Sequence, residues 1–349
     1  MTPTKTIIEG TYLRELLEQP QAVENTISGF RLDARLQQIA RQAAQLKWPR
    51  IILTGMGASL HALHPLNLQL IAHGFTSLIV ETSELIHYMA ALLDEKTLVV
   101  AVSQSGRSAE TVRLLEVQKN KGTLIGITNS ADSPLAVQTN AAIVTHAGKE
   151  STVSCKTYVS SLAALAWLGD VLCEGKPGQN AKDLEQAASA IARYLDKWEQ
   201  HVAELSDELG GVRDIFFVGR GPSLAAAYSG GLIVKESTRY HSEGMSSAAL
   251  RHGPFEMMKP DVFVLVYSGD TKVEPLNRAL VPDIRAASGR AFLCGPEAEL
   301  EALRLPHAPP AVMPLLEILP AQMISLALAS LAGIEAGRFE RATKVTDRE

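Results

Sequence analysis

Hydroxyl and amide side chains gather in one short stretch of the sequence, Ser103-Gln-Ser-Gly-Arg-Ser108. An apolar run at residues 98–102 precedes it, and a helical pattern follows from Thr111. Strand, polar glycine turn and helix are how α/β proteins present N–H groups to an anion, because the first turn of a helix has unpaired donors. No Lys occupies the P-loop position, so the turn suits a sugar phosphate better than a nucleoside triphosphate. By itself, the pattern is equally that of a Ser-capped helix that binds nothing.

This stretch belongs to an alternation of apolar strands and helices. Strands are expected at residues 51–54, 77–80, 98–102, 124–128 and 142–145. The alternation predicts a parallel sheet with helices on both faces, which binds ligands beyond the carboxyl ends of its strands. Residues 8–48 are predicted to form two helices divided by Pro20, and further long helices are expected at 153–172 and 182–209.

The alternation restarts in the second half of the chain as a repeat. Residues 54–60 (TGMGASL) align with 218–224 (VGRGPSL), and residues 105–108 (SGRS) align with 268–271 (SGDT). Two matched motifs at nearly the same separation predict two copies of one α/β unit. Because Asp270 in the second copy would repel a phosphate, we expect the first copy to hold the phosphate and the second to contribute chemistry.

Composition excludes several classes of function. With 349 residues, 46% hydrophobic and 20% charged, the chain is typical of a soluble protein with two domains. A net charge of −5 gives no reason to expect nucleic acid or an anionic membrane as a partner. Neither a membrane span nor a signal peptide is expected. The three scattered cysteines indicate a reducing compartment, so we expect a cytoplasmic protein without a structural zinc site. A metal site at His61, His64, His73 and His87 is rejected because their spacing is irregular.

The GxGxS turn, the SQSGxS loop and their duplication resemble the SIS (sugar isomerase) family of phosphosugar-binding domains. The likeness is greatest to the isomerase half of glucosamine-6-phosphate synthase and covers most of the chain beyond about residue 30. Three more segments and a tail lysine are similar to that pattern: residues 235–243 (KEIxYIHAE in the synthase), 250–254 (LKHGP), 319–323 (LPxQ) and Lys344.

The resemblance implies an α/β fold of two tandem SIS domains, each a five-stranded, flavodoxin-like, doubly wound parallel sheet flanked by helices. The expected division is N-terminal helices at 1–48, a phosphosugar-binding SIS domain at 49–173, a linker and connecting helix at 174–209, a catalytic SIS domain at 210–335, and a tail at 336–349 that closes the site.

Three catalytic residues are implied by the resemblance. Glu236 matches the general base that moves a proton between C1 and C2 of the open-chain sugar, a role favoured if partial burial raises its pKa. His252 matches the residue that opens the sugar ring and comes from the neighbouring subunit, which implies a homodimer. Lys344 matches a lysine that closes over the sugar and forms a Schiff base. Without the family pattern, these positions would be interpreted as a solvent-facing Glu, a helix-capping His and a tail Lys.

The phosphate-binding residues implied by the resemblance are Ser59, Ser103, Gln104, Ser105 and Ser108. The implied sugar contacts are Gly57, Val153 and Glu243, and a helix-surface role remains open for Glu243. Cys155 is expected in the core because the sequence places no basic partner beside it. No metal and no cofactor are implied, and the expected partner is a hexose or hexosamine phosphate.

Two departures from the synthase pattern bear on function. We expect no amidotransferase domain headed by a nucleophilic Cys, because nothing like it fits in this length, and Ile233 stands where the synthase has a Lys. We therefore expect a hydrolytic glucosamine-6-phosphate deaminase that yields fructose 6-phosphate and ammonia. The alternatives are a fructosamine-6-phosphate deglycase, another phosphosugar aldose–ketose isomerase, and, in a different class, a non-catalytic phosphosugar-sensing regulator.

Overall fold

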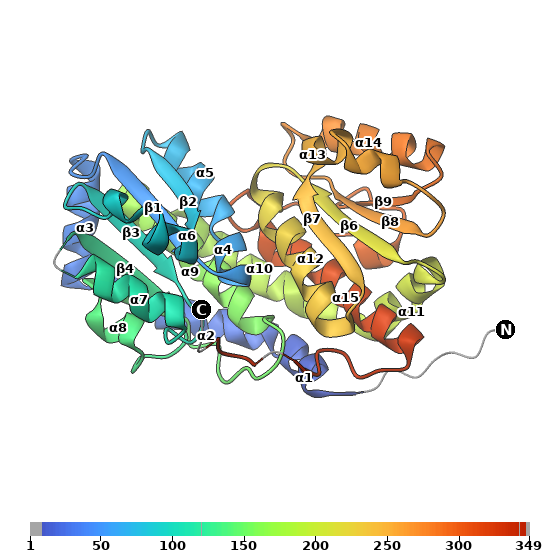
Figure 1. Cartoon of the computed structure of the whole chain (residues 1–349), viewed down its shortest axis with the longest axis horizontal. Helices are drawn as coiled ribbons and strands as arrows, with labels where there is room; N and C mark the ends of the chain where they lie inside the picture. Colours follow the sequence, from blue (N-terminus) through green and yellow to red (C-terminus); the bar gives the residue numbers. More distant parts are fainter. Residues whose placement is uncertain (1–8, 120, 342, 347–349) are drawn as a thin grey trace. The chain divides into compact units, whose positions relative to one another are not determined.

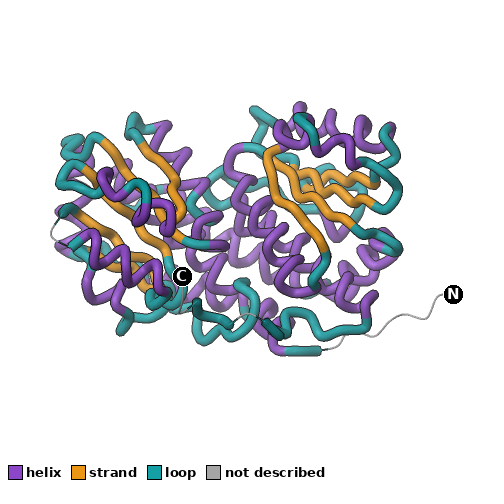
Figure 2. The backbone as a smooth tube through the Cα atoms, viewed as in Figure 1, coloured by secondary structure: helices purple, strands orange, loops and turns teal. Residues whose placement is uncertain are grey.

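The structure is a computed structural model that describes residues 9–119, 121–341 and 343–346. The chain divides into two compact units, each built around one parallel sheet with helices on its faces (Figures 1 and 2). The first-sheet unit comprises Gln19–Glu150, Cys155–Ala188 and Thr343–Glu349, and the second-sheet unit comprises Met1–Glu18, Ser151–Ser154 and Ser189–Ala342. Each unit is therefore assembled from three separate segments of the chain.

The first sheet contains the five strands that the alternation predicts. They are β1 (Arg50–Gly55), β2 (Ser77–Glu81), β3 (Thr97–Val102), β4 (Thr123–Thr128) and β5 (Ala141–Val144). The strands are parallel in the order β2-β1-β3-β4-β5, which is the flavodoxin-like order. Every residue of the central strand β3 is buried. This burial on both faces is why its sequence is an unbroken apolar run.

Helices cover both faces of the first sheet (Figure 1). On one face, Leu85, Leu114 and Leu135 from three helices pack against Ile52 and Val99 of the sheet. On the other face, the most buried helix of the unit packs against three neighbouring helices. The helices on the first face are α6 (Thr82–His87), α7 (Ala109–Gln118) and α8 (Pro134–Gln138). Those on the second face are α9 (Lys156–Glu174), α2 (Gln19–Gly29), α3 (Ala34–Ala44) and α5 (His64–Ala72). The short helix α4 (Gly57–His61) follows β1, and α10 (Gln179–Leu195) begins in this unit.

The second sheet differs from the expected five strands. In the described residues it has four, β6 (Asp214–Gly219), β7 (His241–Ser246), β8 (Val262–Tyr267) and β9 (Arg290–Cys294), in the order β7-β6-β8-β9. The place of a fifth strand holds an isolated bridge between Gly295 and Arg304. Pro306, Pro309 and Pro310 follow this bridge. Because proline has no N–H to donate, the bridge does not extend into a ladder.

The second sheet is also covered on both faces. Leu250 and Leu280 pack against Val264 on one face, while α12 and α15 pack together in the same unit. The helices are α1 (Thr11–Leu17), α11 (Trp198–Leu209), α12 (Leu224–Thr238), α13 (Ser247–Arg251), α14 (Glu274–Ala286) and α15 (Met313–Ala332). In length and mean hydropathy α15 could cross a membrane, but 89% of its apolar stretch is buried within the protein. It is a core helix.

Helix boundaries depart from the expectation in two places. The N-terminal region forms three helices because Pro20 lies in the first turn of α2, where no N–H donor is needed, and a further break precedes α3. Asp33 caps α3 by accepting a hydrogen bond from the Leu36 N–H at 2.8 Å. The helix expected at 182–209 is interrupted between α10 and α11, at residues 196–197.

Candidate functional site

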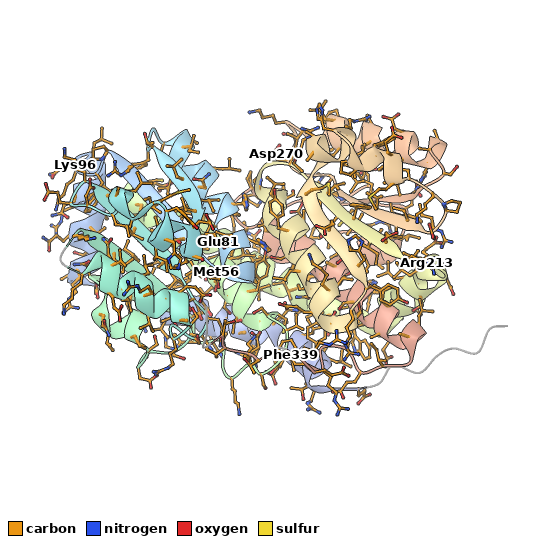
Figure 3. All side chains as sticks on the ribbon, in the orientation of Figure 1. Met56, Glu81, Lys96, Arg213, Asp270 and Phe339 are labelled. Atoms are coloured by element: carbon orange, nitrogen blue, oxygen red, sulfur yellow. The ribbon has the colours of Figure 1, made fainter. Side chains whose placement is uncertain are left out.

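The five predicted phosphate-binding residues follow two neighbouring strands of the first sheet. β1 and β3 pair in register up to Gly55 and Val102 at their carboxyl ends. The chain leaves β1 toward β2 and leaves β3 toward β4, so the strand order reverses between them. Such a switch point is where α/β sheets bind ligands. Met56, labelled in Figure 3, follows β1; Ser59 lies half-buried in α4, and the remaining four residues lie between β3 and α7.

The serine loop, residues 103–108, is arranged to bind an anion. Gly106 adopts a left-handed φ of 62°, and its N–H donates to the Ser103 carbonyl and hydroxyl oxygens, each at 3.1 Å. Ser108 caps α7 by accepting from the Thr111 N–H at 3.4 Å. Within the described part of the chain, the N–H groups of Gln104, Ser105 and Ser108 make no hydrogen bond. Three backbone donors beside half-buried hydroxyls make a cradle of the kind that suits an anion such as a phosphate.

We expect Gly106→Ala to disrupt the serine loop. A Cβ at this position would collide with the Ser133 hydroxyl and would approach Thr128 Oγ1 to 2.9 Å, in addition to the strain of the left-handed backbone. The expected loss in the free energy of unfolding is about 2–4 kcal/mol. The matched control is Gly74→Ala, because Gly74 has a φ of 85° and nothing within 4 Å of its Cβ position. Urea unfolding of the two variants measures the difference, and equal losses would contradict this account of Gly106.

The tail residues 343–346 belong to the same unit as the serine loop. The Ala109 N–H, in the first turn of α7, donates to the Thr346 carbonyl at 3.2 Å. Lys344 Nζ lies 2.5 Å from Glu150 Oε2. The Lys344 side chain is 18% exposed and the Glu150 side chain is fully buried. The structure therefore places the predicted catalytic lysine in the unit that carries the serine loop.

Glu150 is a candidate residue that sequence reasoning missed. Its Oε1 accepts from the N–H groups of Cys155 at 3.0 Å and Thr157 at 3.1 Å, and its Oε2 accepts from Thr157 Oγ1 at 2.5 Å. The start of α9 thus fixes a carboxylate whose remaining partner is the Lys344 ammonium. The local sequence gives no signal for this pairing because the two residues are 194 positions apart.

The second-sheet unit carries the remaining predicted residues. Glu236 lies in the last turn of α12, and His252 caps the carboxyl end of α13; both are exposed. The partial burial that would favour Glu236 as a general base is therefore not present in the single chain. Glu243 lies on strand β7 and not on a helix, and its Oε1 is 3.5 Å from His241 Nε2.

Val153 and Gly57, two of the three predicted sugar contacts, differ in how exposed they are. The Val153 side chain is fully buried in the second-sheet unit, so only its backbone can face a ligand. The adjacent Ser151 is held by Glu15, whose Oε1 accepts from the Ser151 N–H at 2.7 Å. Gly57 is exposed at the start of α4, where its φ of 50° suits glycine.

None of the three cysteines is placed as a nucleophile. Cys155 and Cys294 are fully buried, and Cys173 is partly buried. Burial raises the pKa of Cys173 to about 12, with a smaller contribution from the carboxylates of Asp170 and Glu174. Burial also raises the pKa of Cys294 well above its ordinary value. Since the thiolate is the reactive form, these residues serve the core and not thiol chemistry.

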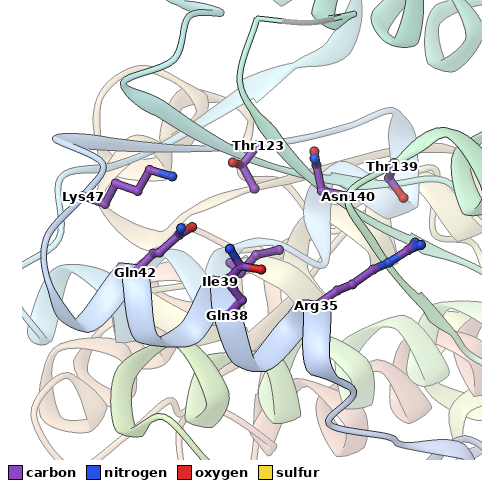
Figure 4. Close-up of a pocket in the computed structure, with 8 residues that line it drawn as sticks. All are labelled: Arg35, Gln38, Ile39, Gln42, Lys47, Thr123, Thr139 and Asn140. Carbon is purple, nitrogen blue, oxygen red and sulfur yellow. The ribbon is translucent and has the colours of Figure 1, made fainter.

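A polar pocket of about 460 Å³ lies at the other end of the first sheet (Figure 4). Gln38 and Gln42 point from α3 toward Thr123 and Asn140. Thr123 begins β4, so this pocket is at the amino ends of the strands, whereas the serine loop is at the carboxyl ends. No predicted site residue lines it.

With the fold and the serine loop described, comparison with known proteins identifies the class. Residues 46–169 match the family described as SIS domain, and the resemblance expected from the sequence is confirmed for this part of the chain. The chain is 31% identical over 338 residues to the glutamine–fructose-6-phosphate aminotransferase (isomerizing) of Pyrococcus horikoshii, covering 93% of this chain and 55% of that relative. It therefore spans about half the length of this relative.

Solved structures show the same fold over nearly the whole chain. The C-terminal domain of glucosamine-fructose-6-phosphate aminotransferase from Francisella tularensis superposes with a TM-score of 0.84 at 23% identity, covering 95% of this chain and 99% of that one. A glucosamine-6-phosphate deaminase from Thermotoga maritima gives a TM-score of 0.81 at 17% identity, covering 97% and 100%. At these identities, the likeness concerns the fold.

Proposed function

We propose that this protein is a phosphosugar enzyme that converts glucosamine 6-phosphate into fructose 6-phosphate and ammonia. The observation that carries the proposal is the serine loop and Ser59 at the switch point, in the same unit as Lys344. In this proposal Ser59, Ser103, Gln104, Ser105 and Ser108 bind the phosphate. In the described residues, the N–H groups of Gln104, Ser105 and Ser108 make no hydrogen bond, and a loop that only caps a helix does not need such donors.

The proposed reaction runs in three steps. His252 opens the ring by moving a proton from the C1 hydroxyl to the ring oxygen. Glu236 takes the C2 proton of the open-chain aldehyde and returns it to C1, while a proton passes from the amine nitrogen to the C1 oxygen, which leaves a hydroxyl at C1 and an imine at C2. Water then adds to C2, and the C–N bond breaks to release ammonia and the ketose. Lys344 assists this hydrolysis, and Gly57, Val153 and Glu243 are the proposed sugar contacts.

The three cysteines of this chain are not placed to act on glutamine. Releasing ammonia from glutamine by nucleophilic catalysis needs a thiolate, and burial of the thiols disfavours that form here. The shared fold with a solved glucosamine-6-phosphate deaminase is compatible with the proposed direction.

We also propose a cytoplasmic homodimer in which His252 completes the site of a second copy. Glu236 and His252 are exposed in the single chain, whereas proton transfer at carbon requires a site from which water is excluded. A symmetric partner would cover both residues. No cofactor is assigned to the reaction.

The test is a coupled assay for ammonia release with glucosamine 6-phosphate and fructosamine 6-phosphate as substrates. We expect turnover of glucosamine 6-phosphate, with fructose 6-phosphate formed in equal amount. Turnover of the fructosamine adduct alone would replace the deaminase with a deglycase. Binding of either compound without any turnover would favour a phosphosugar sensor, and ketose formation without ammonia would indicate a simple aldose–ketose isomerase.

A further inference from the structure

A small cavity at the carboxyl end of the second sheet has no role in the proposed reaction. It has a volume of about 30 Å³, which is enough for a species the size of one water molecule. It is lined by the loops after β8 and β9, by residues 305–308 and by the start of α15. Ser268 and Gly269, in its wall, align with Ser105 and Gly106 of the serine loop. The cavity thus occupies the position of the phosphate cradle in the second copy.

Glu317 contributes the charge of this cavity. The residue is 4% exposed and lines the cavity from α15. Its Oε1 accepts from the Ser223 hydroxyl at 2.7 Å. Among the described residues, its Oε2 has no hydrogen-bond partner. A buried carboxyl oxygen without a partner is unfavourable, so a ligand that satisfies Oε2 would stabilise the fold.

The surroundings favour a cation over an anion. Pro296 and Pro306 line the cavity and have no N–H to offer an anion. Asp270, which is labelled in Figure 3, adds negative charge close enough to raise the pKa of Glu317. Gly295 leaves room for the Ser268 hydroxyl, because a Cβ at residue 295 would collide with it. The wall therefore combines acceptors with negative charge, the reverse of the serine loop.

We propose that this cavity binds a small monovalent cation, the size of ammonium or potassium, with Glu317 as its charged ligand. The cavity volume admits one such ion. Divalent calcium and magnesium favour several oxygen ligands or retained waters, for which about 30 Å³ is too little space. This proposal does not depend on the deaminase reaction, because it rests on residues outside the proposed catalytic set.

Proton and cation compete for Glu317. Burial is the main reason that the pKa of its carboxyl is raised to about 8; the Ser223 hydrogen bond acts in the opposite direction, and the charge of Asp270 contributes to the rise. The other titratable groups facing it are Cys294 at the end of β9 and His307 in the cavity wall. Because the pKa is raised above its ordinary 4.5, this group's contribution to stability is lost as pH rises toward 8. A bound cation offsets this loss, so its effect grows with pH.

The test compares the thermal midpoint Tm of the full chain in chloride salts of choline, ammonium, potassium and magnesium at matched ionic strength. At about pH 9, ammonium or potassium at about ten times its Kd is expected to raise Tm by about 2–4 °C relative to choline, and by less at about pH 6. Glu317→Gln should lose this shift. Glu199→Gln, which changes an exposed carboxylate on α11, should retain it. Comparing the ammonium and potassium arms identifies the preferred ion.

Equal Tm values in all four salts would overturn the proposal, as would an unchanged shift in Glu317→Gln or a larger shift with magnesium than with either monovalent ion. A second measurement on the unaltered protein covers the case in which Glu317→Gln does not fold. Crystals soaked in rubidium chloride should show an anomalous peak beside the Glu317 carboxylate, because rubidium has the charge and nearly the size of both candidate ions. A map without that peak would equally reject the site.

Discussion

Glu236→Gln is expected to slow proton transfer between C1 and C2 by about 1,000-fold or more while phosphosugar binding persists. The amide has nearly the shape of the carboxylate but cannot accept the C2 proton. Because Glu236 is exposed in the last turn of α12, the substitution should leave Tm nearly unchanged. The loss should therefore fall on kcat, with KM close to that of the unaltered enzyme.

The exchange of the C2 proton of glucosamine 6-phosphate, or of a C1 proton of fructose 6-phosphate, with deuterated solvent isolates this step, because the exchange itself needs the base. Calorimetry on the same samples measures binding. Glu199→Gln is again the matched control, since it removes a carboxylate of the same type from the exposed surface of the same unit. Exchange by Glu236→Gln within about tenfold of the unaltered protein would assign the base elsewhere.

Lys344→Ala is expected to lower kcat/KM by about 100-fold and the free energy of unfolding by about 3 kcal/mol. Removal of the ammonium leaves the buried carboxylate of Glu150 with four neutral donors, from Cys155 and Thr157, in place of a charged partner. The same loss releases the tail from α7, because the Thr346 carbonyl that accepts from Ala109 is two residues away. Urea unfolding and steady-state kinetics measure the two effects.

Lys344→Arg separates the anchoring of the tail from amine chemistry. A guanidinium can still pair with Glu150 but cannot form a Schiff base. Stability and slow hydrogen exchange at the Ala109 amide should therefore return, while kcat/KM stays low. Full recovery of activity in Lys344→Arg would limit Lys344 to anchoring, and unaltered activity in Lys344→Ala would remove it from the mechanism.

The strands of the first sheet could be predicted from the sequence because strands that are buried on both faces consist mainly of apolar residues. Each of the five expected strands ends within one residue of the structure, as for residues 98–102 against Thr97–Val102. The second sheet was harder for a physical reason. The resemblance implies a fifth strand, but Pro306 and the prolines that follow remove the donors that such a strand needs.

The features of the site that could not be predicted depend on contacts between residues that are far apart in the sequence. Nothing near Glu150 indicates that its partner is Lys344, and the helical pattern around Glu236 does not reveal which face of α12 remains exposed. Glu317 did leave a signal, a single carboxylate in an otherwise apolar helix. Its position beside a cavity depends on how β8, β9 and α15 meet, which is a tertiary property.

The segmented composition of the first-sheet unit has a consequence for protein synthesis. The ribosome makes β1–β5 early, and this sheet can pair while the second sheet is still being translated. Glu150 then lacks its counter-ion until Lys344 leaves the ribosome, 194 residues later. A chain released shortly before that point would keep both sheets yet lack the lysine and the carbonyl that seats on α7. Activity that depends on Lys344 would therefore require translation through residue 346, whereas folding of the two sheets would not.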